Sequence, residues 1–362
     1  MKIIYVSYAQ VKADDPKIWL SQISFYTGIL EHQAKEHKII SFHSLDQQAT
    51  LTQNSVEYRF INSSRFKQIF PFALNQQVVS ENPNIIIVHG LHFGWHILWL
   101  RLQLRKRIKI FVWHHAEKPK RFPKNILQQI ADRFINGYFF VSKKLAQPWV
   151  DKNQIQSIEK VHELMEASSA FTSANKMEAR EKTGIQGNHN YLWVGRLDEN
   201  KDPVTLIQTF QKFTEYFPKA NLYIIFRGGN LQSVIKKLID TSSEKIHLIG
   251  EIEHRELSAW YNSVEFIIST SHYEGSGIAI CEGMSCGCIP ILTSIPSFDY
   301  MTSGGSVGLL FEAGNPESLL SKLKESTTLD MNQERQRVLK LFSERLSFSA
   351  IANRIQKVIT SE

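Results

Sequence analysis

The sequence predicts an α/β protein built from two doubly wound parallel sheets, and three observations lead to this expectation. Short apolar runs recur along the chain, with helical segments between them. Continuous apolar runs are typical of strands that are buried on both faces, as in a parallel sheet. The chain also has 362 residues, more than one ordinary core accommodates, which favours two domains.

The apolar runs form two series of about five strands each. The first series comprises residues 2–8, 37–43, 84–90, 108–115 and 137–142. The second series comprises residues 191–195, 221–228, 245–250, 264–270 and 288–294. Helices are expected at residues 202–216, 231–240 and 253–263. In open α/β sheets ligands bind at the carboxyl ends of the strands, so candidate functional residues should follow these strands.

A polar stretch separates the two series and contains only one weak strand candidate, residues 158–164. The domain boundary is expected close to this stretch. We therefore assign residues 1–165 to an N-terminal domain and residues 166–345 to a C-terminal domain. The last segment, residues 346–362, predicts an amphipathic helix.

The three cysteines lie close together in the sequence, at Cys281, Cys286 and Cys288. Their spacing, without paired histidines nearby, is poor for zinc, so ordinary buried thiols are expected. The odd number of cysteines and the absence of a signal-peptide pattern favour a reducing, cytoplasmic setting. No run approaches the roughly 18 apolar residues of a membrane span.

Positive charge is concentrated in the N-terminal half. Up to Glu163 there are 22 Lys and Arg against 12 Asp and Glu, a net charge of +10, whereas the remainder has a net charge of −3. Tryptophan, leucine and phenylalanine accompany the cations in residues 93–109 and 118–124. This pattern favours peripheral contact with an anionic membrane surface, at the inner face of the membrane. An ordinary solvated helix is the alternative, and nucleic acid is not expected because no nucleic-acid module is recognisable.

A glycine-rich turn with two carboxylates lies in the stretch YEGSGIAICEGM, residues 273–284. The turn connects a predicted strand to a predicted helix. Backbone amides at a helix start carry the positive end of the helix dipole, and glycines let a phosphate approach them. Glu274 precedes this helix and Glu282 lies inside it, so they can contact different parts of one extended ligand. The alternative is that one glutamate caps the helix and the other lies at the surface.

A second cluster, WVGRLDENKDP, follows the first strand of the second series. Gly195 marks the turn, Arg196 comes next, and Lys201 precedes a helix for which Pro203 is well suited to the first position. A guanidinium and an ammonium are a sensible pair for a diphosphate, and a solvated loop is the alternative. A third glycine turn, FRGGN, follows the next strand with Arg227.

Residues 191–323 resemble the retaining group 1 glycosyltransferases of the GT-B fold, the large family four of that class. The matching segments are VGRLDENKDPVTLI, IIFRGGN, the run from HLIGEIEHRELSAWYNS to CIPILTS, and GLLFEAGNPESL. They stand where the family has G-R-x4-K, a G-x-G turn, E-x7-E with a small-residue helix, and G-x-L. The resemblance implies two Rossmann-like domains facing a central cleft, with the C-terminal helix crossing back to the N-terminal domain.

The resemblance also implies an activity: transfer of a sugar, with retention, from a UDP- or GDP-sugar to a glycan or lipid-linked acceptor in polysaccharide or cell-surface glycan synthesis. Arg196 and Lys201 would neutralise the diphosphate, Glu274 would contact the donor sugar and Glu282 the ribose. No metal and no cofactor are expected, because basic side chains and helix amides replace them. The expected donor-binding residues are Gly195, Arg196, Lys201, Arg227, Gly250, Ile252, Glu274, Gly275, Ser276, Gly277, Ile278 and Glu282.

The family often has a histidine after the fifth strand, near the reacting sugar. The register favours His115 for this role, and a one-residue slip would choose His114. The resemblance therefore implies a catalytic set of His115, His114, Arg196, Lys201 and Glu274. His89 and His92, after the preceding strand, are weaker candidates to line the cleft.

The chain departs from the family's pattern in its N-terminal half. It has no glycine before Gly28, where many members carry a glycine pair, so the resemblance does not assign the acceptor site. Ser276 stands at a position that is often aromatic. Two other functions remain open: a GT-B-fold nucleotide-sugar epimerase, which product analysis would separate, and a non-catalytic nucleotide-sugar-binding partner.

Overall fold

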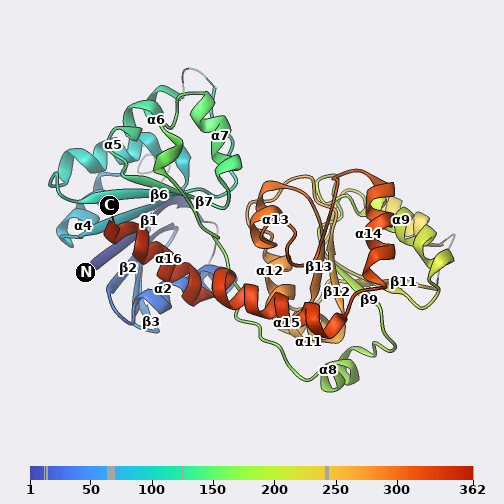
Figure 1. Ribbon diagram of the computed structural model, residues 1–362. Helices are drawn as coiled ribbons and strands as arrows, with labels where there is room; N and C mark the ends of the chain where they lie inside the picture. The colour runs from blue at the N-terminus through green and yellow to red at the C-terminus, as the bar shows by residue number, and fades with distance from the viewer. Residues whose placement is uncertain are drawn as a thin grey trace. The chain divides into compact units, whose positions relative to one another are not determined.

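The computed structural model describes residues 1–11, 13, 15–62, 70–121, 123, 125–240 and 244–361, and these form two compact units. The first unit contains Met1–Ser168 and Phe348–Glu362, and the second contains Ser169–Ser347 (Figure 1). Each unit has its own sheet. Phe122 and Lys124, which belong to one of the predicted basic segments, lie outside the described residues.

The sheet of the first unit has the strand order β3-β4-β2-β1-β5-β6-β7-β8 within the described part of the chain. All neighbours are parallel except β3 and β4, which are antiparallel. The strands are β1 Lys2–Gln10, β2 Lys38–Leu45, β3 Ala49–Gln53, β4 Val56–Asn62, β5 Ile85–His89, β6 Lys109–Trp113, β7 Gly137–Phe140 and β8 Val161–Glu163.

Helices cover both faces of this sheet (Figure 1). The helices are α1 Pro16–Gln22, α2 Ser24–Gln33, α4 Phe72–Ser80, α5 Gly94–Gln103, α6 Asn125–Asp132, α7 Lys143–Asp151 and α16 Phe348–Ser361, with short η1 Leu91–Phe93 and η2 Ile158–Lys160. Helices α4 to α7 pack with one set of strand side chains into a single core. The C-terminal helix α16 packs against α2, where a Cβ on Gly28 would come within 2.7 Å of the Phe348 ring. A glycine at this position therefore lets the two helices approach closely.

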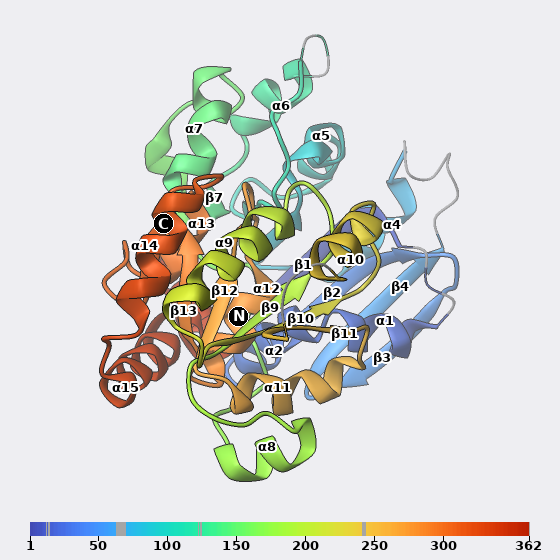
Figure 2. The same cartoon turned by 90° about the vertical axis from the view of Figure 1, so that its right-hand side faces the viewer.

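The sheet of the second unit has the order β11-β10-β9-β12-β13-β14, again within the described residues, and every pairing is parallel (Figure 2). The strands are β9 Asn190–Gly195, β10 Asn221–Phe226, β11 Ile246–Gly250, β12 Phe266–Ser269, β13 Ile289–Thr293 and β14 Leu309–Phe311. Helices α9, α10 and α14 share a core with these strands. The helices are α8 Lys176–Thr183, α9 Pro203–Tyr216, α10 Gln232–Asp240, α11 Leu257–Ser263, α12 Ile278–Ser285, α13 Pro296–Met301, α14 Pro316–Ser326 and α15 Met331–Leu341, with η3 His254–Glu256 and η4 Phe342–Leu346.

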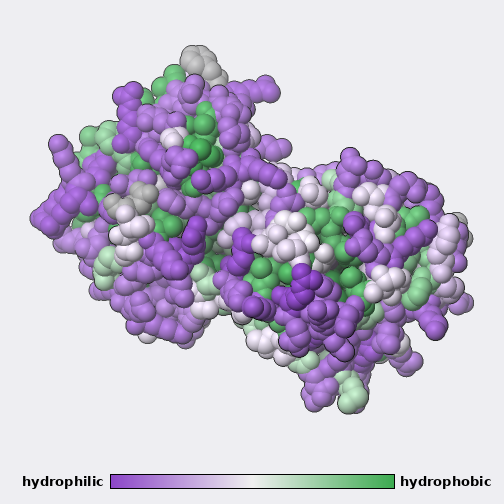
Figure 3. Space-filling view, viewed as in Figure 1, coloured by the Kyte–Doolittle hydropathy of each residue, from purple (hydrophilic) through white to green (hydrophobic). Residues whose placement is uncertain are grey.

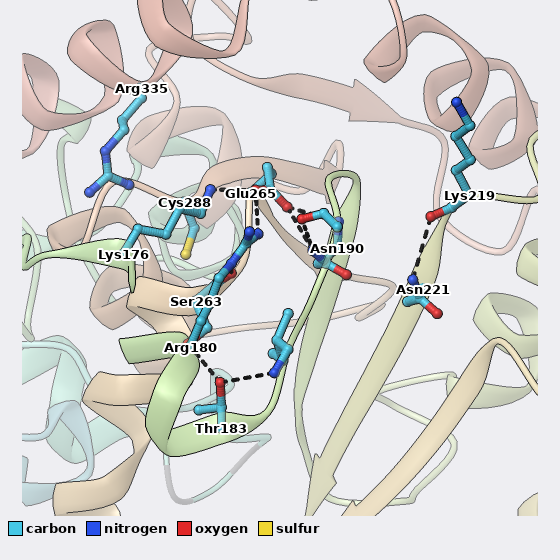
Figure 4. Close-up of polar contacts among 12 residues, drawn as sticks. Lys176, Arg180, Thr183, Asn190, Lys219, Asn221, Ser263, Glu265, Cys288 and Arg335 are labelled. Atoms are coloured by element: carbon cyan, nitrogen blue, oxygen red, sulfur yellow. Dashed lines mark hydrogen bonds and ion pairs between the residues drawn. The ribbon is translucent and has the colours of Figure 1, made fainter. Parts of the chain in front are cut away.

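A buried carboxylate, Glu265, anchors the start of the second unit (Figure 4). Its oxygens accept hydrogen bonds from Lys176 and Arg180 of α8 and, at 2.9 Å, from the backbone amide of Asn190. Because burying an unpaired charge is costly, two cations and an amide are needed to stabilise this glutamate. The contacts hold α8 against the amino ends of β9 and β12.

The predicted architecture of two parallel sheets is confirmed, but the prediction of about five strands in each sheet is too low. The missed strands are β3, β4 and β14. Strands β3 and β4 have exposed or half-buried residues among their apolar ones, so they do not form the continuous apolar runs on which the prediction depended. The start of α9 is as predicted, with Pro203 in its first turn and the Asp202 side chain capping the Thr205 amide at 3.2 Å. No helix in the described residues is long and apolar enough to cross a membrane.

Candidate functional site

The predicted donor-binding residues of the second unit follow four neighbouring strands, β11, β10, β9 and β12. Because these strands are parallel, their carboxyl ends meet at one edge of the sheet. Gly195 and Gly250 are the last residues of β9 and β11, and the others lie beyond the strand ends: Arg196 after β9, Arg227 after β10, Ile252 after β11, and Glu274, Gly275, Ser276, Gly277 and Ile278 after β12. Glu282 lies within α12, the helix that follows.

Hydrogen bonds join the loop after β9 to the loop after β12. The Thr270 hydroxyl donates to the backbone oxygen of Lys201 at 2.7 Å, and the Asn200 side chain donates to the backbone oxygen of Tyr273 at 2.9 Å. The Lys201 ammonium forms an ion pair with the Glu274 carboxylate, and both side chains are largely buried. The structure thus brings together two predicted site residues that are 73 positions apart in the sequence.

The glycine turn FRGGN packs against the chain itself. The Leu197 amide donates to the backbone oxygen of Gly228 at 3.0 Å. Gly229 has a φ of +129°, and a Cβ there would lie 2.2 Å from the Leu197 oxygen. The glycine is therefore required for a close approach between two loops of the protein.

Gly277 is the residue at which α12 begins. Its φ is +57°, in the left-handed region, and a Cβ would meet the Phe298 ring at 2.6 Å. The amides of the first turn of a helix point outward without partners inside the helix, and they carry the positive end of its dipole. Ser276, immediately before, is buried, whereas Gly275 and Ile278 are half-buried. A helix start with this geometry can bind an anion.

The two arginines of the predicted site extend into solvent. Arg196 is 73% exposed and lies 3.2 Å from Asp198, and Arg227 is 84% exposed and lies 3.1 Å from Glu251. Among the ion pairs of the described residues, neither arginine is paired with a carboxylate of the predicted site. They therefore take no part in the Lys201–Glu274 ion pair, but they remain exposed to an anion that approaches this edge.

Glu282 is almost completely buried, and its carboxylate forms hydrogen bonds with two side chains that were not predicted from the sequence. His254 lies 2.6 Å from one carboxylate oxygen, and the Tyr261 hydroxyl donates to the other at 3.0 Å. The hydrogen bond to Glu282 and its charge raise the pKa of His254, although partial burial opposes the shift. Burial, together with the charge of Glu282, raises the pKa of Tyr261 well above its usual value. The spacing of His254 and Tyr261, about two helical turns, is the signal that could have placed them on one face.

The histidines after β6 differ in their surroundings. The His114 side chain is 2% exposed, its ring lies 4.3 Å from the Phe140 ring, and its Nε2 lies 2.9 Å from the Glu117 backbone oxygen. The His115 side chain is 37% exposed. Since successive side chains leave a strand on opposite faces, a slip of one residue exchanges the two environments. His115 is therefore the candidate that can reach a ligand.

His115 contacts two residues from other strand ends. Its Nδ1 lies 2.6 Å from a Glu166 oxygen, and its Nε2 lies 2.8 Å from Nδ1 of His89. Burial lowers the pKa of His115, but the hydrogen bond to Glu166 and the nearby carboxylates outweigh it and raise this pKa above its usual value. The sequence analysis missed Glu166 because nothing in a linear pattern relates it to position 115. His92 is exposed, with its Nε2 3.0 Å from the Lys118 backbone oxygen.

The three cysteines are buried free thiols, and burial raises the pKa of Cys286 to about 11. Within the described parts of the chain, no three side chains of the metal-ligating types are grouped so as to hold a metal ion.

Comparison with known proteins relates part of the second unit to a family. The family model described as "Glycosyl transferases group 1" matches residues 175–340. A GDP-mannose:cellobiosyl-diphosphopolyprenol alpha-mannosyltransferase of Xanthomonas oryzae is 29% identical over 37% of this chain and 36% of its own length. A poly(glycerol-phosphate) alpha-glucosyltransferase of Bacillus subtilis is 27% identical over 37% of this chain and 21% of its own length. The matched regions span less than half of the length of these curated relatives.

Solved structures match the chain along its whole length. A glycosyltransferase from Rickettsia africae superimposes with a TM-score of 0.75 and 15% identity, covering 99% of this chain and 98% of that one. Anabaena HepE in complex with UDP superimposes with a TM-score of 0.73 and 14% identity, covering both chains completely. At this low sequence identity, the structural similarity shows a shared fold and nothing more. Residues 175–340 therefore resemble the group 1 glycosyltransferases, and the chain has the GT-B fold.

Proposed function

We propose that this protein is a retaining glycosyltransferase that moves a sugar from a UDP- or GDP-sugar to a glycan or lipid-linked acceptor. The observation that carries the proposal is the carboxyl edge of the second sheet, where the Lys201–Glu274 pair lies beside the glycine turn that begins α12. A cation, helix amides and a carboxylate are the groups that a nucleotide-diphosphate sugar requires.

The Lys201 ammonium and the Glu274 carboxylate are paired with each other. A bound diphosphate would attract the Lys201 ammonium, which leaves the Glu274 oxygens available to sugar hydroxyls. Arg196 and the amides of Gly277 and Ile278 would share the negative charge that grows as the nucleoside diphosphate departs. These groups supply positive charge from the protein itself, so we expect transfer without a metal ion.

Glu282 is the proposed ligand of the ribose hydroxyls. His254 and Tyr261 fix the orientation of its carboxylate, and a carboxylate with two such donors still has lone pairs for further hydrogen bonds. Gly250 and Ile252, at the end of the neighbouring strand, are proposed to contact the base through their backbone. In the first unit, His115 is the proposed contact to the reacting sugar.

The acceptor proposal draws on the names of the relatives. The Xanthomonas enzyme is named for a diphosphopolyprenol-linked acceptor and the Bacillus enzyme for poly(glycerol-phosphate), both of which are anionic. The net positive charge of the N-terminal half of this chain suits such acceptors. The solved HepE complex supports UDP as one donor nucleotide to test.

Peripheral contact with a membrane is part of the proposal, and helix α6 supports it. This helix buries Gln128 and Asp132, which both bond to the Tyr138 hydroxyl, while Ile126 and Ile130 are exposed. Its polarity is thus the reverse of an ordinary surface helix. Green patches interrupt the hydrophilic surface over the region of α6 and α7 (Figure 3). On α5, which packs against α6, Leu102 is 77% exposed.

Cations follow directly after α5, where Arg105, Lys106 and Arg107 are all exposed. Each cation near an anionic surface contributes about 1 kcal/mol, so replacing all three by glutamine should cost about 3 kcal/mol, on the order of a hundredfold in partitioning. Flotation with anionic and neutral liposomes measures this. A triple replacement of Lys212, Lys219 and Lys236, exposed lysines of the second unit, is the control. Absence of lipid-dependent recovery of the unaltered protein at low salt would reject membrane contact.

The proposed reaction is tested by incubating the protein with UDP- and GDP-sugars and a panel of glycan and lipid-linked acceptors. We expect acceptor-dependent release of nucleoside diphosphate and a product that keeps the anomeric configuration of the donor. Conversion of the nucleotide sugar without an acceptor would instead identify an epimerase. Binding of the nucleotide sugar without any turnover would identify a non-catalytic partner.

A further inference from the structure

A continuous hydrogen-bonded chain of four side chains lies at the carboxyl edge of the first sheet. The Tyr26 hydroxyl lies 2.7 Å from Nε2 of His89, Nδ1 of His89 lies 2.8 Å from Nε2 of His115, and Nδ1 of His115 lies 2.6 Å from Glu166. The residues come from α2, the end of β5, and the loops after β6 and β8. We call these four residues the relay.

Rings pack around the relay and restrict its geometry. The rings of His89 and His115 are inclined by 25° to each other, so the N–H and the lone pair, which lie in the ring planes, can point toward one another. Trp113 lies nearly parallel to both rings, with centroids 5.7 Å from His89 and 6.4 Å from His115. Tyr5 lies 5.9 Å from His89 on the same face of the sheet. These ring contacts favour the observed orientation of both imidazoles.

One assignment of protons satisfies every bond of the relay when His115 is neutral, which holds above the pKa of this histidine. An ionised carboxylate only accepts, so Glu166 requires a proton on Nδ1 of His115. A neutral His115 then has its lone pair on Nε2 and accepts from Nδ1–H of His89. His89 in turn accepts at Nε2 from the Tyr26 hydroxyl, which stays protonated because burial raises the pKa of Tyr26 well above its usual value. All three hydrogen bonds therefore point toward Glu166.

We propose that Glu166 and His89 are positioning residues that fix the tautomer of His115, so that its Nε2 lone pair accepts a hydroxyl of the substrate in place of His89. The proposal rests on the proposed function, since it assigns His115 to the reacting sugar. The exchange is balanced, because a sugar O–H replaces the N–H of His89 as the donor and no proton changes owner. Burial and the neighbouring histidines hold the pKa of His89 well below its usual value, so His89 stays neutral when the exchange occurs.

Other titratable groups face the relay and bear on its pH dependence. Glu117, in the loop after β6, accepts from the backbone amide of His115 at 2.7 Å, and its charge adds to that of Glu166. His114 is adjacent in sequence, His43 of β2 acts on His89, and Tyr5 and Tyr58 act on Tyr26. Glu166 makes the only contact of a carboxylate with the His115 ring among the ion pairs of the described residues. Removing its charge should therefore dominate any change in the titration of His115.

The tautomer is tested on the full-length protein without substrate, by nuclear magnetic resonance of ¹⁵N-labelled histidine. Above the pKa of His115, where its imidazole is neutral, we expect the ring to carry its single proton on Nδ1. In Glu166→Gln, the Nε2–H tautomer should become populated and the titration of His115 should move to lower pH. Glu159→Gln, which alters an exposed glutamate of the same segment, should leave both unchanged. Tyr26→Phe removes only the far end of the relay and should change the His89 signals while His115 keeps its tautomer.

Activity gives a second, separate measurement. If the lone pair of His115 is needed, activity is lost as the pH falls through the pKa of this histidine. Glu166→Gln should reduce kcat about tenfold or more and move the acidic limb of the pH profile to lower pH, whereas a merely structural loss would lower the profile without moving it. A proton on Nε2 of neutral His115 in the unaltered protein, or an unmoved limb in Glu166→Gln, would overturn the proposal. A confirmed tautomer in a protein that transfers no sugar would instead reject the proposed function.

Discussion

The two sheets carry different chemistry at their carboxyl edges. The edge of the second sheet holds ion pairs, such as Lys201 with Glu274, next to a helix start at Gly277. The edge of the first sheet holds the relay, in which neutral rings lead from Tyr26 to the single carboxylate of Glu166. Paired charges suit a ligand with several negative charges, whereas a directed hydrogen-bond chain suits one hydroxyl. Two sheets of the same architecture can therefore be assigned different halves of one reaction.

The largest effect on activity is expected when Lys201, the largely buried cation at the carboxyl edge of the second sheet, is removed. Lys201→Ala should reduce turnover or donor affinity at least tenfold, about 1.4 kcal/mol, because the diphosphate loses one of its two proposed cations. Steady-state kinetics against each nucleotide sugar measure this. Lys212→Ala, on the same helix that Lys201 precedes, removes an exposed lysine and is the control. Equal kinetics in the two variants would show that the paired charges do not serve the donor.

The second effect concerns the carboxylate that His254 and Tyr261 orient. Glu282→Ala should also reduce turnover or donor affinity at least tenfold, about 1.4 kcal/mol, since the proposed ribose ligand is lost. Glu282→Gln keeps the size of the side chain and guards against loss of folding, and Glu317→Ala removes an exposed carboxylate of the same unit. If both Glu282→Gln and Glu282→Ala fold and keep their affinity for the donor, Glu282 does not bind the donor.

A third effect tests whether the start of α12 depends on a glycine. Gly277→Ala forces an L side chain into the left-handed region and against Phe298. The strain alone should cost about 1–2 kcal/mol, and the contact adds to it, so Tm should fall by roughly 2–8 °C. Gly187→Ala is matched, because Gly187 also has a positive φ but has no atom within 4 Å of the added Cβ. If calorimetry finds the same Tm change in both variants, the Phe298 ring moves away from the added methyl group without a measurable cost.

The smallest effect is a pH dependence of stability. Glu282 raises the pKa of His254 in the folded protein above its value of about 6.5 in the unfolded chain. Its contribution to stability is therefore complete below that value and is lost as the pH rises through the folded pKa. His254→Gln should consequently lower Tm more at pH 6 than at pH 9. A Tm difference that does not depend on pH would mean that the imidazolium contributes nothing.

The sequence predicted best those features that depend on neighbouring residues in the chain. The order of strand, glycine turn and helix around Gly277 follows from neighbouring residues, and so does the start of α9 at Pro203. Strands β3 and β4 were missed because part of their length faces solvent, which interrupts the apolar run. The fold class and most of the strands were predictable because a strand that is buried on both faces appears in the sequence as a continuous apolar run.

Contacts between distant segments were not predictable in the same way. Glu166 reaches His115 across 51 positions and His89 reaches it across 26, and only the strand order brings these residues to one place. The choice between His114 and His115 depends on the face of the sheet from which each side chain projects. An error of one residue in the register exchanges the two histidines. The sequence contained the candidates, but their partners follow from the topology.

The central claim is that the carboxyl edge of the second sheet is the donor site. Isothermal titration of the protein with UDP, GDP, ADP and their sugars tests it most directly. We expect one nucleotide diphosphate and its sugar to bind, at least tenfold more weakly in Lys201→Ala, about 1.4 kcal/mol, and with unchanged affinity in Lys212→Ala. Binding that is equally strong in Lys201→Ala, or no binding of any of these nucleotides to the folded protein, would contradict the account.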